Sequence, residues 1–231
     1  MARRRIAITG IGLVTPLGIG TELTWARVRA GESGIGPITR FDTSEFTTRI
    51  AGEVRDFDGT QWGIAKRELR QMDLFVQYGL AAAQMAWDQA GLSVEKPDPE
   101  RTGVYVGAGM GGLPVIETTL ESLRTKGPRH GISPFFTPSV IINLAPGQIS
   151  IRHDCRGPNM SMVSACSTGA HSIGEAARLI ERGDADVGDD RSDQGPGQGG
   201  SQVELRSAPL GDDVADRGGV EVRHLGPEPD R

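Results

Sequence analysis

Blocks of apolar residues separated by glycine, proline and charged residues run along most of the chain. Residues 5–10 (RIAITG) form a short apolar run that ends in glycine, which is typical of a strand followed by a turn. Residues 21–30 predict a helix with Thr21 as its N-cap and Gly31 just past its end. Residues 32–67 mix polar residues with turn formers, and they predict short strands and loops.

The strongest helical pattern covers residues 69–92. The side chains that share one face of this helix are Leu74, Tyr78, Ala81, Ala82 and Met85. Gly91 closes the pattern, so we expect a long and well-buried helix.

Further strand and helix patterns follow. Residues 102–112 (TGVYVGAGMGG) predict a strand that runs into a glycine loop. Residues 137–152 predict one helix, capped by Thr137 with Pro138 at its first position. Residues 161–174 (SMVSACSTGAHSIG) read as a short strand that enters a helix at Cys166. Alternation of this kind predicts a layered α/β fold.

Composition narrows the class of protein. The chain has 231 residues with 37% apolar content, which is enough for one sizeable core. Its formal net charge of −5 does not indicate a basic surface for binding nucleic acid. No apolar run approaches the length of a membrane span, and the N-terminal apolar stretch is too short for a signal peptide. Cys155 and Cys166 have no disulfide or metal spacing, so we expect a cytoplasmic protein without a metal site.

Cys166 is the candidate for chemistry. Backbone amides at the start of a helix point toward a side chain at the preceding junction, and this favours the thiolate that a nucleophile needs. Its small neighbours, among them Ser164, Ala165 and Gly169, leave room for an acyl group. Buried cysteine is also common packing material, so the residues alone leave a structural role open.

Several motifs together resemble one family. They are TGIGLVTPLG at 9–18, SGI at 33–35, FDTS at 41–44, MDLFVQYGLAAA at 72–83, VGAGMGGL at 106–113, ISPFFTPSVIIN at 132–143 and RGPNMSMVSACSTGAHSIGEAARLIERGDADV at 156–187. The chain is similar over residues 3–187 to the elongating β-ketoacyl-acyl carrier protein synthases, and most to the type II condensing enzymes of bacterial fatty-acid synthesis.

The resemblance implies a fold and a reaction. It implies the N-terminal half of a thiolase-like αβαβα fold with a mixed sheet over residues 1–187. Cys166 would accept an acyl chain from acyl carrier protein, and condensation with malonyl carrier protein would give a 3-ketoacyl product. Met110 would gate the acyl pocket, and Phe136 would line it from the partner subunit of a homodimer. No cofactor is implied.

The family also uses two histidines, a lysine and a glycine-rich segment from its C-terminal half, and those motifs are absent. The chain's histidines, His130, His153, His171 and His224, lack the matching context. His130 and His153 read as solvated loop residues, and His171 occupies a position where the family often has a histidine without a proton-transfer role. Two functions from different classes follow. The first is a fragment of a fatty-acid or polyketide ketoacyl synthase that is inactive alone. The second is a non-catalytic remnant that only pairs with an intact subunit or carrier protein.

Residues 188–231 differ from the rest of the chain. They contain no Ile, Met, Phe, Tyr, Trp or Lys, so we expect a disordered tail with little regular structure. The family has an apolar strand of the type Met-Ile-Ala-Gly-Gly here. The codons GGT GAT GAT CGC would encode residues 188–191, and read one base later they give Val-Met-Ile followed by alanine. We therefore interpret the tail as a frameshift product.

Overall fold

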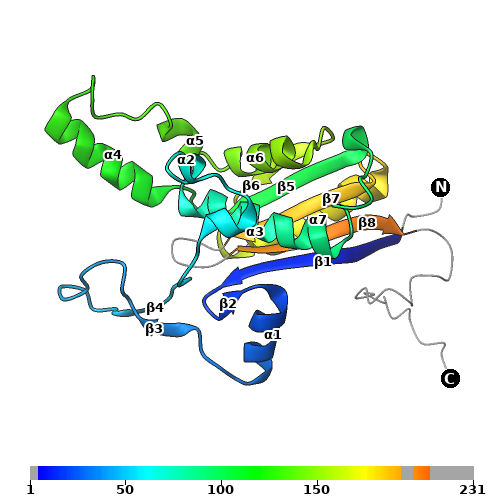
Figure 1. Cartoon of the computed structure of the whole chain (residues 1–231), viewed down its shortest axis with the longest axis horizontal. Helices are drawn as coiled ribbons and strands as arrows, with labels where there is room; N and C mark the ends of the chain where they lie inside the picture. Colours follow the sequence, from blue (N-terminus) through cyan, green and yellow to red (C-terminus); the bar gives the residue numbers. More distant parts are fainter. Residues whose placement is uncertain (1–4, 194–199, 209–231) are drawn as a thin grey trace.

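The computed structural model describes residues 5–193 and 200–208 (Figure 1). The strands are β1 (Arg5–Thr15), β2 (Gly18–Ile19), β3 (Ile35–Pro37), β4 (Ile50–Gly52), β5 (Thr102–Ala108), β6 (Asn159–Met162), β7 (Val187–Asp193) and β8 (Gly200–Ala208). The α-helices are α1 (Thr21–Arg29), α2 (Lys66–Leu69), α3 (Leu74–Gln89), α4 (Leu113–Lys126), α5 (Phe136–Val140), α6 (Leu144–His153) and α7 (Thr168–Arg182). The 3₁₀ turns are η1 (Gly59–Trp62), η2 (Pro99–Arg101) and η3 (Ala165–Ser167).

The main sheet has six strands in the order β2-β1-β8-β7-β5-β6. β5 runs parallel to both β6 and β7, whereas β8 is antiparallel to β7 and β1. The expected mixed sheet is therefore confirmed. A separate two-stranded hairpin, β3 with β4, belongs to the short elements expected between residues 32 and 67.

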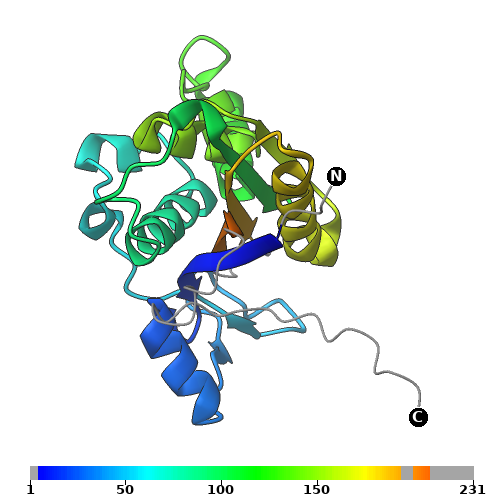
Figure 2. The same cartoon turned by 90° about the vertical axis from the view of Figure 1, so that its right-hand side faces the viewer.

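Helices cover both faces of this sheet. Val104, Val106 and Ala108 of β5 pack in one cluster with side chains of α3 and α6. Tyr105, on the opposite face, packs with Ala176 and Ile180 of α7. Every residue of β5 is buried, and Figure 2 shows α3 and α7 on opposite sides of the sheet. The layered α/β arrangement predicted from the sequence is confirmed.

Small residues let α3 approach β1 closely. A Cβ atom at Gly10 would overlap the carbonyl oxygen of Ala86, and one at Gly12 would overlap that of Ala82. Ala82 and Ala86 are completely buried. The backbone of β1 therefore lies directly against α3, and this contact fixes the position of β1.

The prediction of a single helix at residues 137–152 is wrong. The structure has two helices, α5 and α6, and Ile141 between them has an extended backbone. In one continuous helix the nitrogen of Pro146 would have to donate to the carbonyl of Ile142, but proline has no N–H and its ring would clash there. In α6, Pro146 lies in the first turn, where no donor is needed. Thr137 is the second residue of α5 and not a cap.

Other elements differ in detail from the sequence predictions. β1 continues beyond Gly10 to Thr15, with a register irregularity between Ile8 and Gly10. The N-cap of α1 is Gly20 and not Thr21. Leu74, expected on the buried face of α3, is 38% exposed because it is the first residue of the helix. The helix α4 was not predicted.

The tail is only partly as expected. Residues 188–193 continue β7 and residues 200–208 form β8, so the prediction of little regular structure is wrong for these segments. Backbone pairing accounts for the difference, since β7 and β8 occupy the interior of the sheet between β5 and β1. Residues 194–199 and 209–231 lie outside the described residues.

Candidate active site

The two loops that carry Met110 and Cys166 leave the same end of the sheet. β5 and β6 are adjacent and parallel, with Gly107 paired to Met162. The chain continues from β5 into the glycine loop that holds Met110, and from β6 into the turn that holds Cys166. In α/β proteins the carboxyl ends of parallel strands are the usual place for ligand sites.

Cys166 is exposed in η3, directly before the fifteen-residue helix α7. This is the strand-to-helix junction expected from the sequence. The other cysteine, Cys155, is buried, and both thiols are free. Cys166 is therefore the accessible thiol in the described part of the chain, and it lies directly before the N-terminus of α7.

The residue before the cysteine has an unusual backbone. Ala165 has a φ of 52°, in the left-handed region. This conformation is unfavourable in free energy for any residue that has a Cβ atom. Such conformations persist only where the surroundings hold them, and they concentrate at functional sites. This feature has no signal in the sequence, since alanine is neutral at most positions.

Ser164 is held at three points next to this strained residue. Its N–H donates to Thr168 Oγ1 (2.8 Å), its carbonyl accepts from Ser167 N–H (3.1 Å), and its hydroxyl bonds His171 Nδ1 (2.7 Å). The sequence patterns predict none of these bonds: they indicate only that Ser164 is small, and they give His171 no proton-transfer role. The small polar residues around Cys166 were the available signal.

The start of α7 is packed tightly against β5. A Cβ atom at Gly107 would overlap Thr168 Cγ2 and Ser172 Oγ. Thr168 and Ser172 are both buried. Glycine at this strand position therefore lets the helix that follows Cys166 lie against the sheet.

Met110 and Phe136 lie on segments that meet. Met110 is 54% exposed, and Phe136 is the half-buried first residue of α5. The glycine loop contacts the end of α5, because Gly112 N–H donates to the Val140 carbonyl (3.4 Å). The structure therefore brings Met110 to the same end of the sheet as Cys166, and the helix of Phe136 to the loop of Met110.

The other histidines occupy different surroundings. His130 is exposed between α4 and α5, as expected. His153 is not a solvated loop residue, because it ends α6 and its ring stacks on Trp87 at 4.3 Å between centroids. His224 lies outside the described residues.

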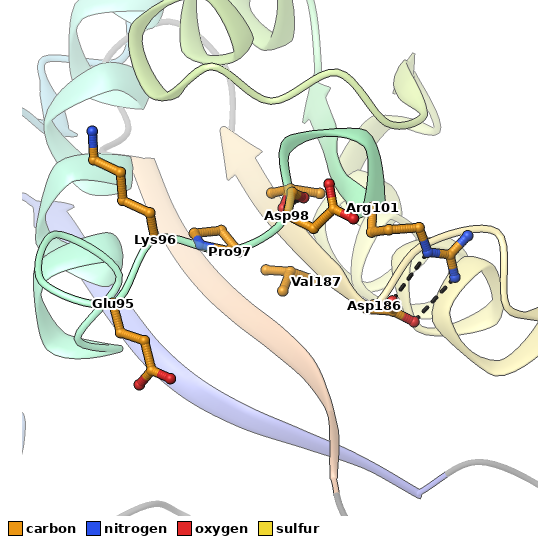
Figure 3. Close-up of a pocket in the computed structure, with 8 residues that line it drawn as sticks. Glu95, Lys96, Pro97, Asp98, Arg101, Asp186 and Val187 are labelled. Carbon is orange, nitrogen blue, oxygen red and sulfur yellow. Dashed lines mark hydrogen bonds and ion pairs between the residues drawn. The ribbon is translucent and has the colours of Figure 1, made fainter.

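A separate pocket lies at the opposite end of the sheet, where β5 and β7 begin. It is lined by Glu95, Lys96, Pro97, Asp98, Arg101, Thr102, Asp186 and Val187 (Figure 3). Arg101 donates to both carboxylate oxygens of Asp186 and to the carbonyl of Gly183. Through these bonds the guanidinium of Arg101 joins η2 to the segment before β7. We therefore assign no chemistry to this pocket.

Comparison with known proteins gives consistent relatives. A family profile described as "Beta-ketoacyl synthase, N-terminal domain" matches residues 3–188. The chain is 49% identical over 187 residues to 3-oxoacyl-[acyl-carrier-protein] synthase 2 of Coxiella burnetii, covering 81% of this chain and 45% of that protein. The protein of the same name from Vibrio cholerae is 48% identical with the same coverage.

Solved structures give the same fold. The ishigamide ketosynthase/chain length factor superposes with a TM-score of 0.79 at 29% identity, covering 89% of this chain and 59% of that chain. A type II polyketide ketosynthase in complex with its acyl-carrier protein (AntDE:AntF) has a TM-score of 0.74 at 24% identity, covering 89% and 63%. The chain spans about half the length of the curated relatives it matches. Among the described residues, no helix is long and apolar enough to cross a membrane.

Proposed function

Because this chain belongs to the β-ketoacyl synthase family, we propose that it carries the acyl-accepting part of a 3-oxoacyl-[acyl-carrier-protein] synthase of type II fatty-acid elongation. The observation that carries the proposal is the exposed Cys166 at the start of α7. The names of the curated relatives support acyl carrier protein as the partner that delivers the substrate.

The proposed reaction has two halves. In the first, the Cys166 thiolate attacks the acyl thioester on carrier protein, a new thioester forms on the sulfur, and the carrier thiol leaves. In the second, malonyl carrier protein loses carbon dioxide, and the resulting carbanion attacks the Cys166 thioester. The 3-ketoacyl product then leaves on carrier protein, and the thiolate is restored.

Individual residues have separate proposed roles. The backbone N–H of Cys166 would donate to the oxyanion that forms on the acyl carbonyl. Met110 would gate the acyl pocket, which is supported by its place on the loop after β5. Phe136 would line the pocket of a neighbouring subunit. A reactive free thiol also needs a reducing compartment, so the proposal includes a cytoplasmic location.

We further propose a homodimer through β6. This strand lies at the edge of the sheet, where its outer backbone groups can pair with another strand. Met160 and Val163 beside this edge are 50% and 55% exposed. Pairing of two β6 strands across a two-fold axis would cover both residues in each subunit. Light scattering of the wild type against Met160→Lys tests this, and a monomeric wild type contradicts it.

The second half of the reaction is proposed to need groups that this chain lacks. Decarboxylation requires donors that stabilise charge on the malonyl thioester, and the family supplies them from its C-terminal half. Loss of one oxyanion donor alone costs about 10²- to 10³-fold in rate. We therefore expect acyl transfer to Cys166 without condensation.

Residues 188–231 are proposed to be a frame-shifted reading of the family's next segment. The interior position of β7 supports this, because a strand covered on both faces normally has apolar residues, whereas residues 188–191 are Gly-Asp-Asp-Arg. Sequencing the locus tests the proposal. A continuous frame on both sides of codon 188, with no apolar strand in another frame, would refute it.

The decisive experiment separates the two half-reactions. The purified 231-residue chain and a Cys166→Ala control are incubated with acyl carrier protein carrying a labelled acyl chain, and peptide mass spectrometry locates the label. Malonyl carrier protein is then added, and carbon dioxide and 3-ketoacyl product are measured. Label on Cys166 without product supports the proposal. No label with intact folding favours a non-catalytic remnant, and turnover that depends on Cys166 contradicts the need for further groups.

A polyketide ketosynthase is the second candidate, because the solved ketosynthase structures share the fold. The identity of 49% to the elongation enzyme against 29% to the ishigamide protein favours fatty-acid elongation. Comparing transfer from saturated acyl chains with transfer from polyketide chains distinguishes these two pathways.

A further inference from the structure

Two side chains of α7 reach back to the residue that precedes the strained turn. Thr168 and His171 are three positions apart on the helix, so they lie on the same face. Thr168 Oγ1 accepts the Ser164 N–H, and His171 Nδ1 bonds the Ser164 hydroxyl at 2.7 Å. Ser164 is therefore fixed to the first two turns of the helix.

The helix itself is a rigid support for this contact. Thr168 and Ser172 are 2% and 0% exposed, and both abut Gly107 of the fully buried β5. A bond from His171 to Ser164 therefore ties the turn to the sheet as well as to the helix.

The turn needs such support because its backbone is strained. Ser164 has φ −142° and ψ 41°, and Ala165 follows with φ 52°. Rotation about the N–Cα bond of Ala165 would relax this residue to a negative φ and would turn the Cα–Cβ bond of Cys166 away from its present direction. The bonds on Ser164 oppose that rotation.

The imidazole of His171 uses its Nδ1 atom for the hydrogen bond with the Ser164 hydroxyl. When the ring is neutral with the proton on Nε2, the Ser164 hydroxyl donates to Nδ1; when the ring is charged, Nδ1–H donates to Ser164 Oγ. The bond can form in both states. The geometry therefore supports a contact that orients the turn.

We propose that His171 is a positioning residue for the Cys166 nucleophile and acts through the hydroxyl of Ser164. This inference rests on the proposed function for the role of Cys166. It adds that the contact between the second turn of α7 and residue 164 sets the direction of the thiol.

The test replaces His171 with asparagine or glutamine, whose carboxamide groups differ only in their distance from the backbone. The carboxamide of asparagine takes the place of a histidine Nδ1, whereas that of glutamine lies farther out, near the place of Nε2. We would compare His171→Asn, His171→Gln, His171→Ala and Ser164→Ala with the wild type. Arg178→Ala, which removes an exposed ion pair with Glu175 on the same helix, is the control.

The measurement is the rate of Cys166 alkylation by iodoacetamide between pH 6 and 10. Peptide mass spectrometry separates this label from any on the buried Cys155, and thermal unfolding is recorded for every variant. The reaction needs no carrier protein, so its result is independent of the acyl-transfer assay. Absence of acyl transfer would refute the proposed function and leave the contact between His171 and Ser164 to be judged by alkylation.

We expect His171→Gln, His171→Ala and Ser164→Ala each to slow alkylation about three- to tenfold, the range that loss of one ordinary hydrogen bond gives. The double variant of Ser164→Ala and His171→Ala should be no slower than either single one, because both remove the same contact. His171→Asn and Arg178→Ala should keep the wild-type rate and pH profile.

Three results would overturn the proposal. The first is an unchanged rate in His171→Gln or Ser164→Ala. The second is His171→Asn as slow as His171→Gln, because the imidazole itself would then be required. The third is additive loss in the double variant. If His171→Ala does not fold, the comparison of asparagine with glutamine decides.

Discussion

Glu53 accepts a 2.8 Å hydrogen bond from the Thr39 hydroxyl, and the same carboxylate accepts the N–H groups of Thr39 and Arg40. Arg40 in turn donates to Tyr78 Oη of α3 at 2.8 Å. Through these contacts the segment around the β3–β4 hairpin is fixed to the central helix. Glu53 is 5% exposed, so its carboxylate depends on these donors.

The first prediction concerns pH. The hydrogen bond from Thr39 is the main cause that lowers the pKa of Glu53, against the opposing effect of burial. A lowered folded-state pKa stabilises the fold above the unfolded-state pKa of about 4.3, and this contribution is lost as the pH falls through the folded-state value. Glu53→Gln should lower the free energy of unfolding by about 1–2 kcal/mol at pH 7 and by less near pH 3.

Urea unfolding at both pH values measures this difference. Glu45→Gln is the matched control, since Glu45 is an exposed carboxylate in the same segment. A loss of stability in Glu53→Gln that is equal at pH 7 and pH 3 would contradict the assigned cause.

The second prediction concerns the strained turn. Ala165→Val places a β-branched side chain at φ 52°, and we expect it to destabilise the protein by about 1–3 kcal/mol and to slow alkylation of Cys166. Ala170→Val is the control, because Ala170 is exposed inside α7 and the change there should cost less than about 1 kcal/mol. Equal melting temperatures for the two variants would refute strain at residue 165.

The third prediction concerns the contact between β1 and α3. Gly12→Ala inserts a methyl group where the carbonyl of Ala82 lies, so we expect a large loss of stability or failure to fold. Gly147→Ala makes the same substitution inside α6, where an added Cβ atom would meet no atom within 4 Å apart from its chain neighbours and the backbone of its own helix. It should stabilise the protein by about 0.5–1 kcal/mol. Circular dichroism melting of both variants tests the pair, and the reverse order would contradict the packing described.

The fourth prediction concerns β7. The register pairs Asp189 with Val104 and Asp190 with Tyr105, in the interior of a sheet covered by helices on both faces. Replacing residues 188–191 with Val-Met-Ile-Ala should raise the melting temperature and the resistance to proteolysis. Replacement with Ser-Asn-Asn-Gln removes the charges without adding apolar surface and is the control. An equal gain from both replacements would show that charge repulsion matters more than apolar burial.

Local patterns predicted much of the fold. The periodicity around Tyr78 and Ala82 gave the buried helix α3, and the β-branched run around Val104 gave the buried strand β5. The break before α6 was missed because Thr137 and Pro138 suggest a helix start, whereas the effect of Pro146 appears only when the missing N–H is followed to Ile142.

The site was predictable only in part. The junction between strand and helix singles out Cys166 in the sequence, whereas Met110 and Phe136 follow only from the family resemblance. The left-handed backbone of Ala165 and the contacts of Ser164 depend on how α7 packs on Gly107, which is a property of the assembled layers. The strands β7 and β8 were missed because composition describes what a segment can bury, whereas the neighbouring strands determine where its backbone pairs.

The order of strands also bears on how the chain folds. β1 begins the described chain and pairs with β8, with Arg5 opposite Ala208. This part of the sheet therefore forms only when residues far apart in the sequence meet, and long-range pairing of this kind slows folding because loop closure precedes the stabilising contacts. During synthesis β1 leaves the ribosome well before β8, so the edge of β1 that pairs with β8 stays open until β8 arrives. An open strand edge can pair with another chain, and aggregation then competes with folding.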